Sequence, residues 1–552
     1  MSKKESEESK KTSDVNPKIS RRNLLRKAAI GAGVVVVGGV AYYLSSRAPT
    51  LPVNSTVPEA TVPNATIVST TQSSFPIADR MTLAYNTFTA GLNDLYNSAI
   101  DDAKTAKINW QQFSGTSINF QRASWGPAMD QYWNNWNTLF TQLTGITVNG
   151  GSYEAIDQEE KQRLELVGKQ GIHAGFWPMY MGDVSRFAPS GGVQSLTEYL
   201  NDPTLTDLNW YDPNDFLDIT QGMVNGTLYG VQKDFDGYGI MYQKDYLDEA
   251  GLAPPYNLTW DQLEQYVSAL HHPEKGIYGF MATGAGEPFN DWLNMFFAYG
   301  GQYFDANWNP VFNNAVGLAA TERWVKLLQT YAPPGEAAAT TYDMREACAK
   351  GQVAIAMLSF YRMGMYWSEA LGTPANRVGQ IYTGYMPSGP AGKAALIAAN
   401  CAVINGFASD TEKKACWLYL QFLTSKLGTA YLLGGSGSPE FPRKSSMQIP
   451  AINAYYSQVD NYTTFYPNTM SAIGPGCRYT YDNGFPEFSQ IKELLDSALT
   501  SAISGEKTTK DALDYAAQQV QSMMSQAGYY NPGTPKYSNF IVPYTGPALP
   551  TP

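Results

Sequence analysis

Thr116-Ser-Ile-Asn-Phe-Gln-Arg-Ala-Ser-Trp125 is the stretch that decides the fold, because it predicts the first strand of the body. The Gly126-Pro127 pair that follows ends this strand and starts a helix that runs to about residue 143. The next predicted elements are a strand at 146–148, a helix near 157–168 and a buried run at 175–177. Strands and helices that alternate at this spacing indicate βαβ units with a parallel sheet, and therefore the α/β class.

Capping patterns mark the starts of later helices. They are Thr259 with Gln262, Ser409 with Glu412, and Thr508 with Asp511. In each pattern the hydroxyl accepts from the backbone one turn ahead, so each predicts a helix start. A polar amphipathic helix is expected near 79–107, with no function assigned, and the Pro-rich residues 528–552 are expected to form a non-helical tail.

The 552 residues suit two lobes plus appendages better than a single core. Residues 1–47 carry ten Lys or Arg against four Asp or Glu, a net charge of +6. Because the net charge of the whole chain is −11, the remaining residues carry a net charge of −17. This acidic body argues against binding of nucleic acid, whose affinity for proteins comes from neutralised phosphates. The basic head suits the cytoplasmic side of a membrane.

Aromatic residues make up 13% of the chain, with 37 Tyr and 12 Trp. They either fill a large core or line a binding surface that is part polar and part apolar. The four cysteines (Cys348, Cys401, Cys416, Cys477) and three histidines show no metal-ligand spacing, so we expect no metal, cofactor or redox role. One or two disulfides and free buried thiols both remain open.

An uncharged run of 17 residues, 28–44, follows Ser20-Arg21-Arg22-Asn-Leu-Leu-Arg26. The arginine pair resembles a twin-arginine export signal, and an ordinary signal anchor is the alternative. The run is just long enough to span a membrane, and no clear cleavage site or lipid-accepting cysteine lies near it. We therefore expect a cytoplasmic head at 1–27, an uncleaved anchor at 28–44 and an extended linker at 45–75.

Five Asn-x-Ser/Thr sequences are candidates for surface glycosylation. They are Asn54, Asn64, Asn225, Asn257 and Asn461.

The binding site is expected where loops follow the strands, because ligands of open α/β sheets sit at the carboxyl ends of the strands. These loops follow 120–125, with Trp125 as a candidate contact, 176–177 and 228–231. They are rich in Trp, Tyr, Gly and Asp. Such a composition suits a sugar, since aromatic rings stack on its C–H faces and polar groups bind its hydroxyls.

Several segments in order resemble the family 1 extracellular solute-binding proteins, which include the maltose-binding proteins. The segments are Phe176-Trp-Pro-Met-Tyr-Met-Gly-Asp183, Gly226-Thr-Leu-Tyr-Gly-Val231, Tyr242-Gln-Lys-Asp-Tyr-Leu-Asp-Glu-Ala-Gly-Leu252, Ala349-Lys-Gly-Gln-Val-Ala-Ile-Ala-Met357 and Ala415-Cys-Trp-Leu-Tyr-Leu-Gln-Phe-Leu-Thr-Ser425. The resemblance covers about residues 115–527. It implies the two-lobed periplasmic-binding-protein type II fold, in which a ligand closes the cleft between the lobes like a Venus flytrap.

The same resemblance implies where the lobes lie. Lobe one is expected at 115–235 and 402–455, and lobe two at 240–399 and 465–527, with crossings near 235–239, 400 and 461. Gly237 and Gly239 are hinge candidates, because glycine absorbs backbone rotation at little cost.

The resemblance also implies ligand contacts. Trp177 and Asp183 fall in the first cleft loop, and Asp236 falls on the crossing strand, where relatives often hold a carboxylate against sugar hydroxyls. Further candidates are Glu287, Trp292, Tyr361, Trp367, Arg478, Tyr479 and Tyr481. Packing in the core is the alternative role for each of these residues.

The implied function is capture without chemistry. The lobes would close on a carbohydrate, most simply an oligosaccharide, and deliver it to an ABC permease with its cytoplasmic ATPase. We expect a monomer held at the extracellular face of the cell membrane by its N-terminal segment. The alternatives are a binding protein for a non-sugar solute, a surface receptor or coat protein, and a polysaccharide-acting enzyme. An enzyme would need two flanking carboxylates, and no spacing in the sequence supports them.

Overall fold

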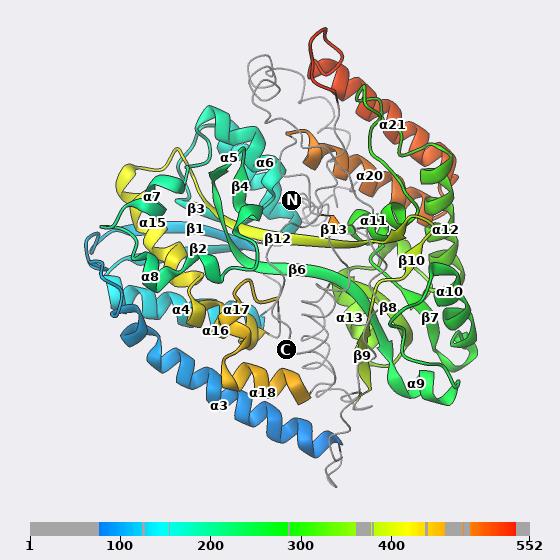
Figure 1. Ribbon diagram of the computed structural model, residues 1–552, viewed down its shortest axis with the longest axis horizontal. Coiled ribbons are helices and arrows are strands. Elements are labelled where there is room, and N and C mark those ends of the chain that lie inside the picture. Colours follow the sequence, from blue (N-terminus) through cyan, green and yellow to red (C-terminus); the bar gives the residue numbers. More distant parts are fainter. Residues whose placement is uncertain are drawn as a thin grey trace, which may run out of the picture.

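The computed structural model describes residues 77–123, 127–153, 155–284, 288–359, 377, 380–436, 440–458, 478–479 and 486–536. They form two α/β lobes that lie side by side (Figure 1). Two long strands, β6 (Gly230–Gln243) and β12 (Ala395–Ile404), run across the centre of the view and belong to both lobes. The predicted two-lobed α/β architecture is confirmed.

Strand β6 changes its hydrogen-bonding partner where it passes from one lobe to the other. Up to Gly237 it is antiparallel to β12, and from Tyr238 it is antiparallel to β8 (Val353–Ser359) and β9 (Ile381–Gly384). The exchange joins the lobes in one sheet with the order β2-β1-β3-β12-β6-β8-β7. Backbone hydrogen bonds therefore continue through the boundary between the lobes.

The sheet of lobe one is built from the predicted βαβ units. β1 (Ser117–Ala123) is parallel to β2 (Thr147–Tyr153) and to β3 (Gly175–Met179), and α4 (Pro127–Thr144) and α5 (Ala155–Val167) make the connections. The predicted parallel pairing is confirmed for these strands. The sheet as a whole is mixed, because β12 is antiparallel to β3 and β6.

The prediction of a loop after 228–231 is wrong. β6 begins at Gly230 and continues for 14 residues without a turn. Gln232 is fully buried and donates from Nε2 to the carbonyl of Asp218 at 2.7 Å. This hydrogen bond joins the first part of β6 to the segment around Asp218. Side chains from this region therefore project from a strand.

Lobe one contains further helices and turns around its sheet. The helices are α3 (Ile77–Ala103), α6 (Met181–Phe187), α7 (Thr197–Asn201), α8 (Leu208–Tyr211), α15 (Asp410–Leu423), α16 (Lys426–Ser436), α17 (Lys444–Met447) and α18 (Pro450–Gln458). A hairpin of β4 (Met223–Val224) and β5 (Thr227–Leu228) and the single turns η1 (Ala188–Ser190), η2 (Pro213–Asp215) and η3 (Ile219–Gly222) complete it.

Lobe two places its helices around β7, β8 and β9. Its helices are α9 (Lys244–Glu249), α10 (Trp260–Ala269), α11 (Pro288–Ala298), α12 (Ala315–Tyr331), α13 (Thr341–Ala349), α20 (Phe488–Ile503) and α21 (Thr509–Gln526). The remaining elements are β7 (Tyr278–Met281), β10 (Ser388–Gly389), β11 (Gly392–Lys393), β13 (Arg478–Tyr479), η4 (Pro273–Lys275) and η5 (Glu336–Ala338).

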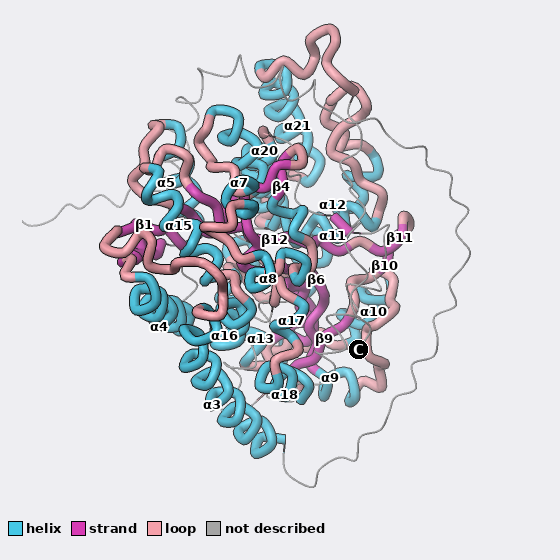
Figure 2. Tube along the Cα trace, turned by 60° about the vertical axis from the view of Figure 1, so that its left-hand side comes forward, coloured by secondary structure: helices cyan, strands magenta, loops and turns pink. Residues whose placement is uncertain are grey.

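Helix α3 is a long amphipathic helix on the outside of lobe one (Figure 2). Its buried apolar residues recur at helical spacing: Phe88, Leu92, Leu95, Ala99 and Ala103. This stripe packs on α4, α16 and α18, all in lobe one. The helix therefore belongs to lobe one, although the sequence assigned it no role.

The predicted helix starts are confirmed in detail. Thr259 and Gln262 exchange both bonds of a capping box, and so do Ser409 and Glu412. Thr508 accepts from the backbone N–H of Asp511 at 3.1 Å. These caps satisfy N–H groups that the first turn of a helix leaves without a partner.

The aromatic residues of the described part of the chain mainly fill the cores. Among the described tryptophans only Trp210 is not buried. One core includes Trp133, Trp136 and Trp417 in lobe one, and the other includes Trp292 and Trp324 in lobe two. For these rings the packing alternative is the correct one.

The cysteines within the described residues form no disulfide. Cys348, Cys401 and Cys416 are buried free thiols on α13, β12 and α15, and burial raises the pKa of each. Cys477 lies outside the described residues. Two disulfides would need all four cysteines, and they are excluded because the other three are free thiols.

The start of the C-terminal tail packs back on lobe two. Trp308 donates from Nε1 to the carbonyl of Pro535 at 2.8 Å, and Lys536 contacts the side chain of Asn307. The predicted head, anchor and linker at 1–75 lie outside the described residues. Within the described residues, no helix is long and apolar enough to cross a membrane.

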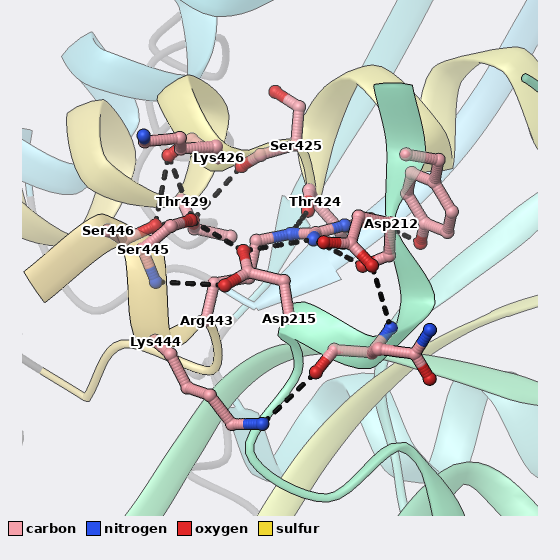
Figure 3. Close-up of polar contacts among 12 residues, drawn as sticks. Asp212, Asp215, Thr424, Ser425, Lys426, Thr429, Arg443, Lys444, Ser445 and Ser446 are labelled. Atoms are coloured by element: carbon pink, nitrogen blue, oxygen red, sulfur yellow. Dashed lines mark hydrogen bonds and ion pairs between the residues drawn. The ribbon is translucent and has the colours of Figure 1, made fainter. Parts of the chain in front are cut away.

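A buried arginine holds three distant segments of lobe one together (Figure 3). Arg443 donates from Nε to the carbonyl of Thr424 at 2.6 Å and from Nη1 to the carbonyl of Asp212 at 3.0 Å. Its Nη1 also lies 3.3 Å from a carboxylate oxygen of Asp215, and its guanidinium lies 3.9 Å from the ring centroid of Phe216. Because a buried charge is costly unless it is paired and hydrogen-bonded, this network fixes the geometry of the segments it joins.

We expect Arg443→Met to lower the free energy of unfolding by about 3 kcal/mol, because it removes the donor of the Thr424 carbonyl and the positive charge beside the Asp215 carboxylate. Urea denaturation followed by tryptophan fluorescence measures this loss. Lys444→Met is the control, since Lys444 makes one exposed bond to the carbonyl of Asn214 and its loss should cost below about 0.5 kcal/mol. Equal losses in the two variants would contradict the role given to Arg443.

Candidate functional site

Several predicted ligand contacts lie outside the described residues. They are Trp125, Glu287, Tyr361, Trp367 and Tyr481. Arg478 and Tyr479 form β13, whose backbone pairs with Ala395 and Leu396 at the start of β12, and their side chains are not described. These seven assignments stay predictions.

Trp177 was expected in the first cleft loop, but it is the middle residue of β3 and its ring belongs to the core of lobe one. None of its surface is exposed, and its ring centroid lies 5.3 Å from that of Trp133. The ammonium of Lys233 lies 4.2 Å from the same centroid, close enough for a cation–π interaction. Trp177 therefore supports the strand ends that carry the site, and in this conformation it offers no face to a ligand.

The crossing strand carries a buried pair of charges beside this ring. Lys233 Nζ and Asp234 Oδ2 are 3.8 Å apart, and both side chains are nearly inaccessible. Burial lowers the pKa of Lys233 and raises the pKa of Asp234, because both charged forms lose water. The two charges stabilise each other, and the ring of Trp177 also stabilises the ammonium of Lys233. Electrostatic attraction therefore holds this part of β6 in place together with the hydrogen bonds of the sheet.

Asp236 and the hinge candidates follow two residues later. The backbone of Asp236 pairs with Ala398 of β12, and its side chain is not described. Gly237 pairs with Ile397 of β12, whereas Gly239 pairs with Leu358 of β8. The two glycines therefore flank the point where β6 leaves one lobe for the other.

Asp183 lies where the lobes meet. It is in the first turn of α6, and α6 packs against α20 of lobe two; we call this contact the α6–α20 junction. Its Oδ2 accepts from Arg163 Nε at 2.9 Å, while its Oδ1 is buried and has no hydrogen-bond partner within the described residues. One carboxylate oxygen thus keeps its capacity to accept a hydrogen bond.

Arg163 of α5 also reaches lobe two. Its Nη1 lies 2.5 Å from Glu493 Oε1 on α20, and its Nη2 lies 3.4 Å from Glu159. Burial alone would lower the pKa of Arg163, but the three carboxylates around it raise that pKa above its ordinary value. The guanidinium is therefore held as a fixed positive charge at the junction.

Further buried polar atoms near the junction have no partner within the described residues. Gln158 of α5 donates from Nε2 to the carbonyl of Trp177, but its Oε1 accepts nothing. Ser489, in the first turn of α20, is 3% exposed and its hydroxyl is likewise unpaired. Buried polar groups in proteins nearly always find a partner, so such groups on both lobes indicate a ligand or water between them.

The sequence did not single out Gln158, Arg163 or Ser489. A glutamine or serine on a helix carries no positional signal, and the pairing of α5 with α20 joins residues more than 300 positions apart. The only sequence signal was the four-residue spacing of Gln158 and Gln162, which places both amides on one face of the helix. There Gln158 donates to the carbonyl of Trp177, and Gln162 donates to the carbonyl of Pro178.

Trp292 does not lie at the junction. It is fully buried in the core of lobe two, where its ring stacks on Phe296 with centroids 4.2 Å apart. Its N–H donates to the hydroxyl of Thr321 at 2.9 Å. This placement corresponds to the packing alternative.

Two buried carboxylates hold the residues that follow β7. Glu336 accepts from the N–H of Ala282 at 3.0 Å, and Asp291 accepts from the N–H of Thr283 at 2.6 Å. Gly284 is required next to them, because a Cβ there would lie 1.7 Å from the carbonyl oxygen of Glu336. Burial, reinforced by the nearby charge of Asp291, raises the pKa of Glu336 to about 8.

No group of three or more His, Cys, Asp or Glu side chains in the described ranges could hold a metal ion. Among the glycosylation candidates, Asn225 sits with Gly226 in the β4–β5 turn, and both residues have positive φ. Asn225 and Asn257 are exposed, and Asn54, Asn64 and Asn461 lie outside the described residues.

Comparison with known proteins places the chain among binding proteins. A family model described as "Bacterial extracellular solute-binding protein" matches residues 136–456. The mannitol-binding protein of Pseudomonas aeruginosa is 24% identical over 382 residues, which cover 67% of this chain and 85% of that protein. The erythritol/L-threitol-binding protein of Mycolicibacterium smegmatis is 23% identical over 359 residues, or 58% of this chain and 69% of that protein.

Solved structures share the fold. A ribitol complex of an ABC transporter solute-binding protein from Agrobacterium radiobacter superposes with a TM-score of 0.64 at 22% identity, covering 74% of this chain and 99% of that one. The maltose-bound MalE3 of T. maritima gives a TM-score of 0.62 at 19% identity, with 74% and 100% covered.

The raised pKa of Glu336 predicts a pH dependence of stability. The folded protein holds this proton up to about pH 8, whereas the unfolded chain releases it near pH 4.5. Stability should therefore fall as pH rises between these values, by up to about 1.4 kcal/mol per pH unit relative to Glu336→Gln. Urea denaturation at several pH values measures the slope. Glu346→Gln, on exposed α13 surface, should keep the wild-type slope, and an unchanged slope in Glu336→Gln would contradict the assignment.

Proposed function

The chain belongs to the bacterial extracellular solute-binding proteins, as its motifs predicted, and on that premise we propose that it captures a small polyol or sugar at the α6–α20 junction. The captured solute passes to an ABC permease with a cytoplasmic ATPase. The N-terminal segment holds the protein at the extracellular face of the membrane. Capture needs no bond to be made or broken in the ligand.

The observation that carries the proposal is a set of buried polar atoms on both lobes that have no hydrogen-bond partner within the described residues. Asp183 Oδ1 and Gln158 Oε1 can each accept from a ligand hydroxyl, and the Ser489 hydroxyl can donate or accept. Hydrogen bonds to a charged group contribute roughly 1.5–3 kcal/mol and neutral ones about 1 kcal/mol. A hydroxyl-rich ligand that bridges α6 and α20 gains from both lobes at once.

A small ligand is favoured over an oligosaccharide by two facts. Relatives of this chain are named for mannitol and for erythritol and L-threitol, which are short polyols. In addition, Trp177 and Trp292, which were expected to stack on sugar rings, are fully buried. Trp125, Tyr361, Trp367 and Tyr481 stay candidates for stacking, and Asp236, Glu287, Arg478 and Tyr479 for polar contacts.

Closure is proposed to turn on the crossing strands. Gly237 and Gly239 flank the partner exchange of β6, so rotation there moves lobe two relative to lobe one with little change inside either. A ligand favours the closed form only to the extent that it binds that form better than the open one. Contacts to Asp183 on one side and Ser489 on the other supply this difference.

We expect the full-length chain to bind at least one of mannitol, ribitol and erythritol in isothermal titration calorimetry, with one site per chain. The heat should arise from hydrogen bonds formed at the junction. Binding of maltotriose but of no polyol would favour the oligosaccharide alternative. Binding of amino acids or polyamines alone would overturn the proposal, and so would release of reducing ends from a polysaccharide.

We expect Ser489→Ala to weaken binding of the polyol about two- to tenfold, because it removes one neutral hydrogen bond to the ligand. The melting temperature without ligand should not fall, since the hydroxyl has no partner among the described residues. Ser501→Ala on the same helix is the control; its hydroxyl already bonds to the carbonyl of Ala498, and its affinity for the ligand should match wild type. An unchanged affinity in Ser489→Ala would remove α20 from the site.

A further inference from the structure

We propose that Arg163 and Glu493 form a charged latch between the lobes, which sets how long the closed form lasts without either group touching the ligand. The inference rests on the proposed capture by lobe closure. The inference goes beyond that proposal, because it assigns part of the free energy of lobe closure to contacts within the protein. Arg163 and Glu493 then act as positioning residues.

Arg163 spans the boundary with a single guanidinium. Its Nε is held by Asp183 of lobe one, while its Nη1 lies 2.5 Å from Glu493 Oε1 of lobe two. A planar guanidinium can bind two carboxylates through different nitrogen atoms. Asp183 of lobe one therefore orders the Arg163 side chain before closure brings Glu493 of lobe two against it. The arginine is 20% exposed and is already ordered by Asp183, so little side-chain entropy is lost on closure.

A second pair of opposite charges faces across the same junction. Arg186 lies in the last turn of α6, and Glu487 precedes α20. Burial raises the pKa of Glu487, while its bond to Tyr529 and the charge of Arg186 act in the opposite direction. Lobe one thus presents two arginines, with Asp183 and Glu159 beside Arg163, where lobe two presents two glutamates.

The remaining cation of α20 does not oppose this arrangement. Lys492 is paired with Asp496 on its own helix at 2.8 Å. Its ammonium also lies 5.9 Å from the ring centroid of Tyr180, which precedes α6. The charges that face each other at the junction are therefore complementary, and complementary charges favour approach of the two surfaces.

Opening separates Arg163 from Glu493 but leaves Asp183 with its arginine. The latch therefore biases the closed form, and its strength depends on salt because Glu493 is 58% exposed. Substitutions belong on Glu493, since changing Arg163 would also disturb Asp183 in the proposed binding site.

The first test uses the ligand-free, full-length chain. Double electron–electron resonance between spin labels on α7 of lobe one and α10 of lobe two measures the distance between the lobes. Glu493→Lys places a second cation opposite Arg163, and we expect the distribution to shift toward longer distances at low salt. An unchanged distribution would overturn the latch, whatever solute the protein binds.

The second test measures ligand dissociation. For Glu493→Gln we expect about 1.4- to fivefold faster release of a bound polyol at low ionic strength, the range of an exposed ion pair. The difference should shrink toward none at about 0.5 M salt. Glu493→Asp, which keeps the charge on a shorter side chain, should fall between Glu493→Gln and wild type.

The matched control is Asp248→Asn. Asp248 is also a 58% exposed carboxylate of lobe two, but its partner Lys244 belongs to the same short helix. Its release rate and its distance distribution should match wild type. Equal effects in Asp248→Asn and Glu493→Gln would indicate a general effect of net charge and would overturn the latch. If no polyol binds, the proposed ligand fails while the distance measurement still decides on the latch.

Discussion

The partner exchange of β6 is the constraint on which the structure depends. One strand is hydrogen-bonded to β12 on its first half and to β8 and β9 on its second half. The lobes are therefore connected by backbone ladders that meet between Gly237 and Tyr238. The buried pair of Lys233 and Asp234 lies on the strand just before that point.

Local order was predictable from the sequence because it depends on neighbouring residues. The βαβ units and the caps at Thr259, Ser409 and Thr508 follow from turn residues and capping side chains within a few positions. The continuation of β6 past residue 231 was not predictable in this way. A strand that passes between lobes is stabilised by partners distant in the sequence, and its glycines look locally like a turn.

The candidate site was only partly predictable. Asp183 was singled out and lies at the junction, but Arg163 and Glu493 meet only because α5 and α20 are brought together by the fold. Trp177 and Trp292 show the limit for aromatic residues. A tryptophan in a core and one that stacks on a ligand have the same local sequence, and only packing, such as Lys233 over the ring of Trp177, distinguishes them. Unpaired polar atoms such as Gln158 Oε1 become visible only once every neighbour is placed.

The attachment of α3 makes the two lobes mechanically unequal. Its apolar stripe is packed on α4, α16 and α18, so the polypeptide that enters the body at residue 77 is joined to lobe one. In the proposed closure, α3 moves as part of lobe one, and lobe two rotates relative to both of them.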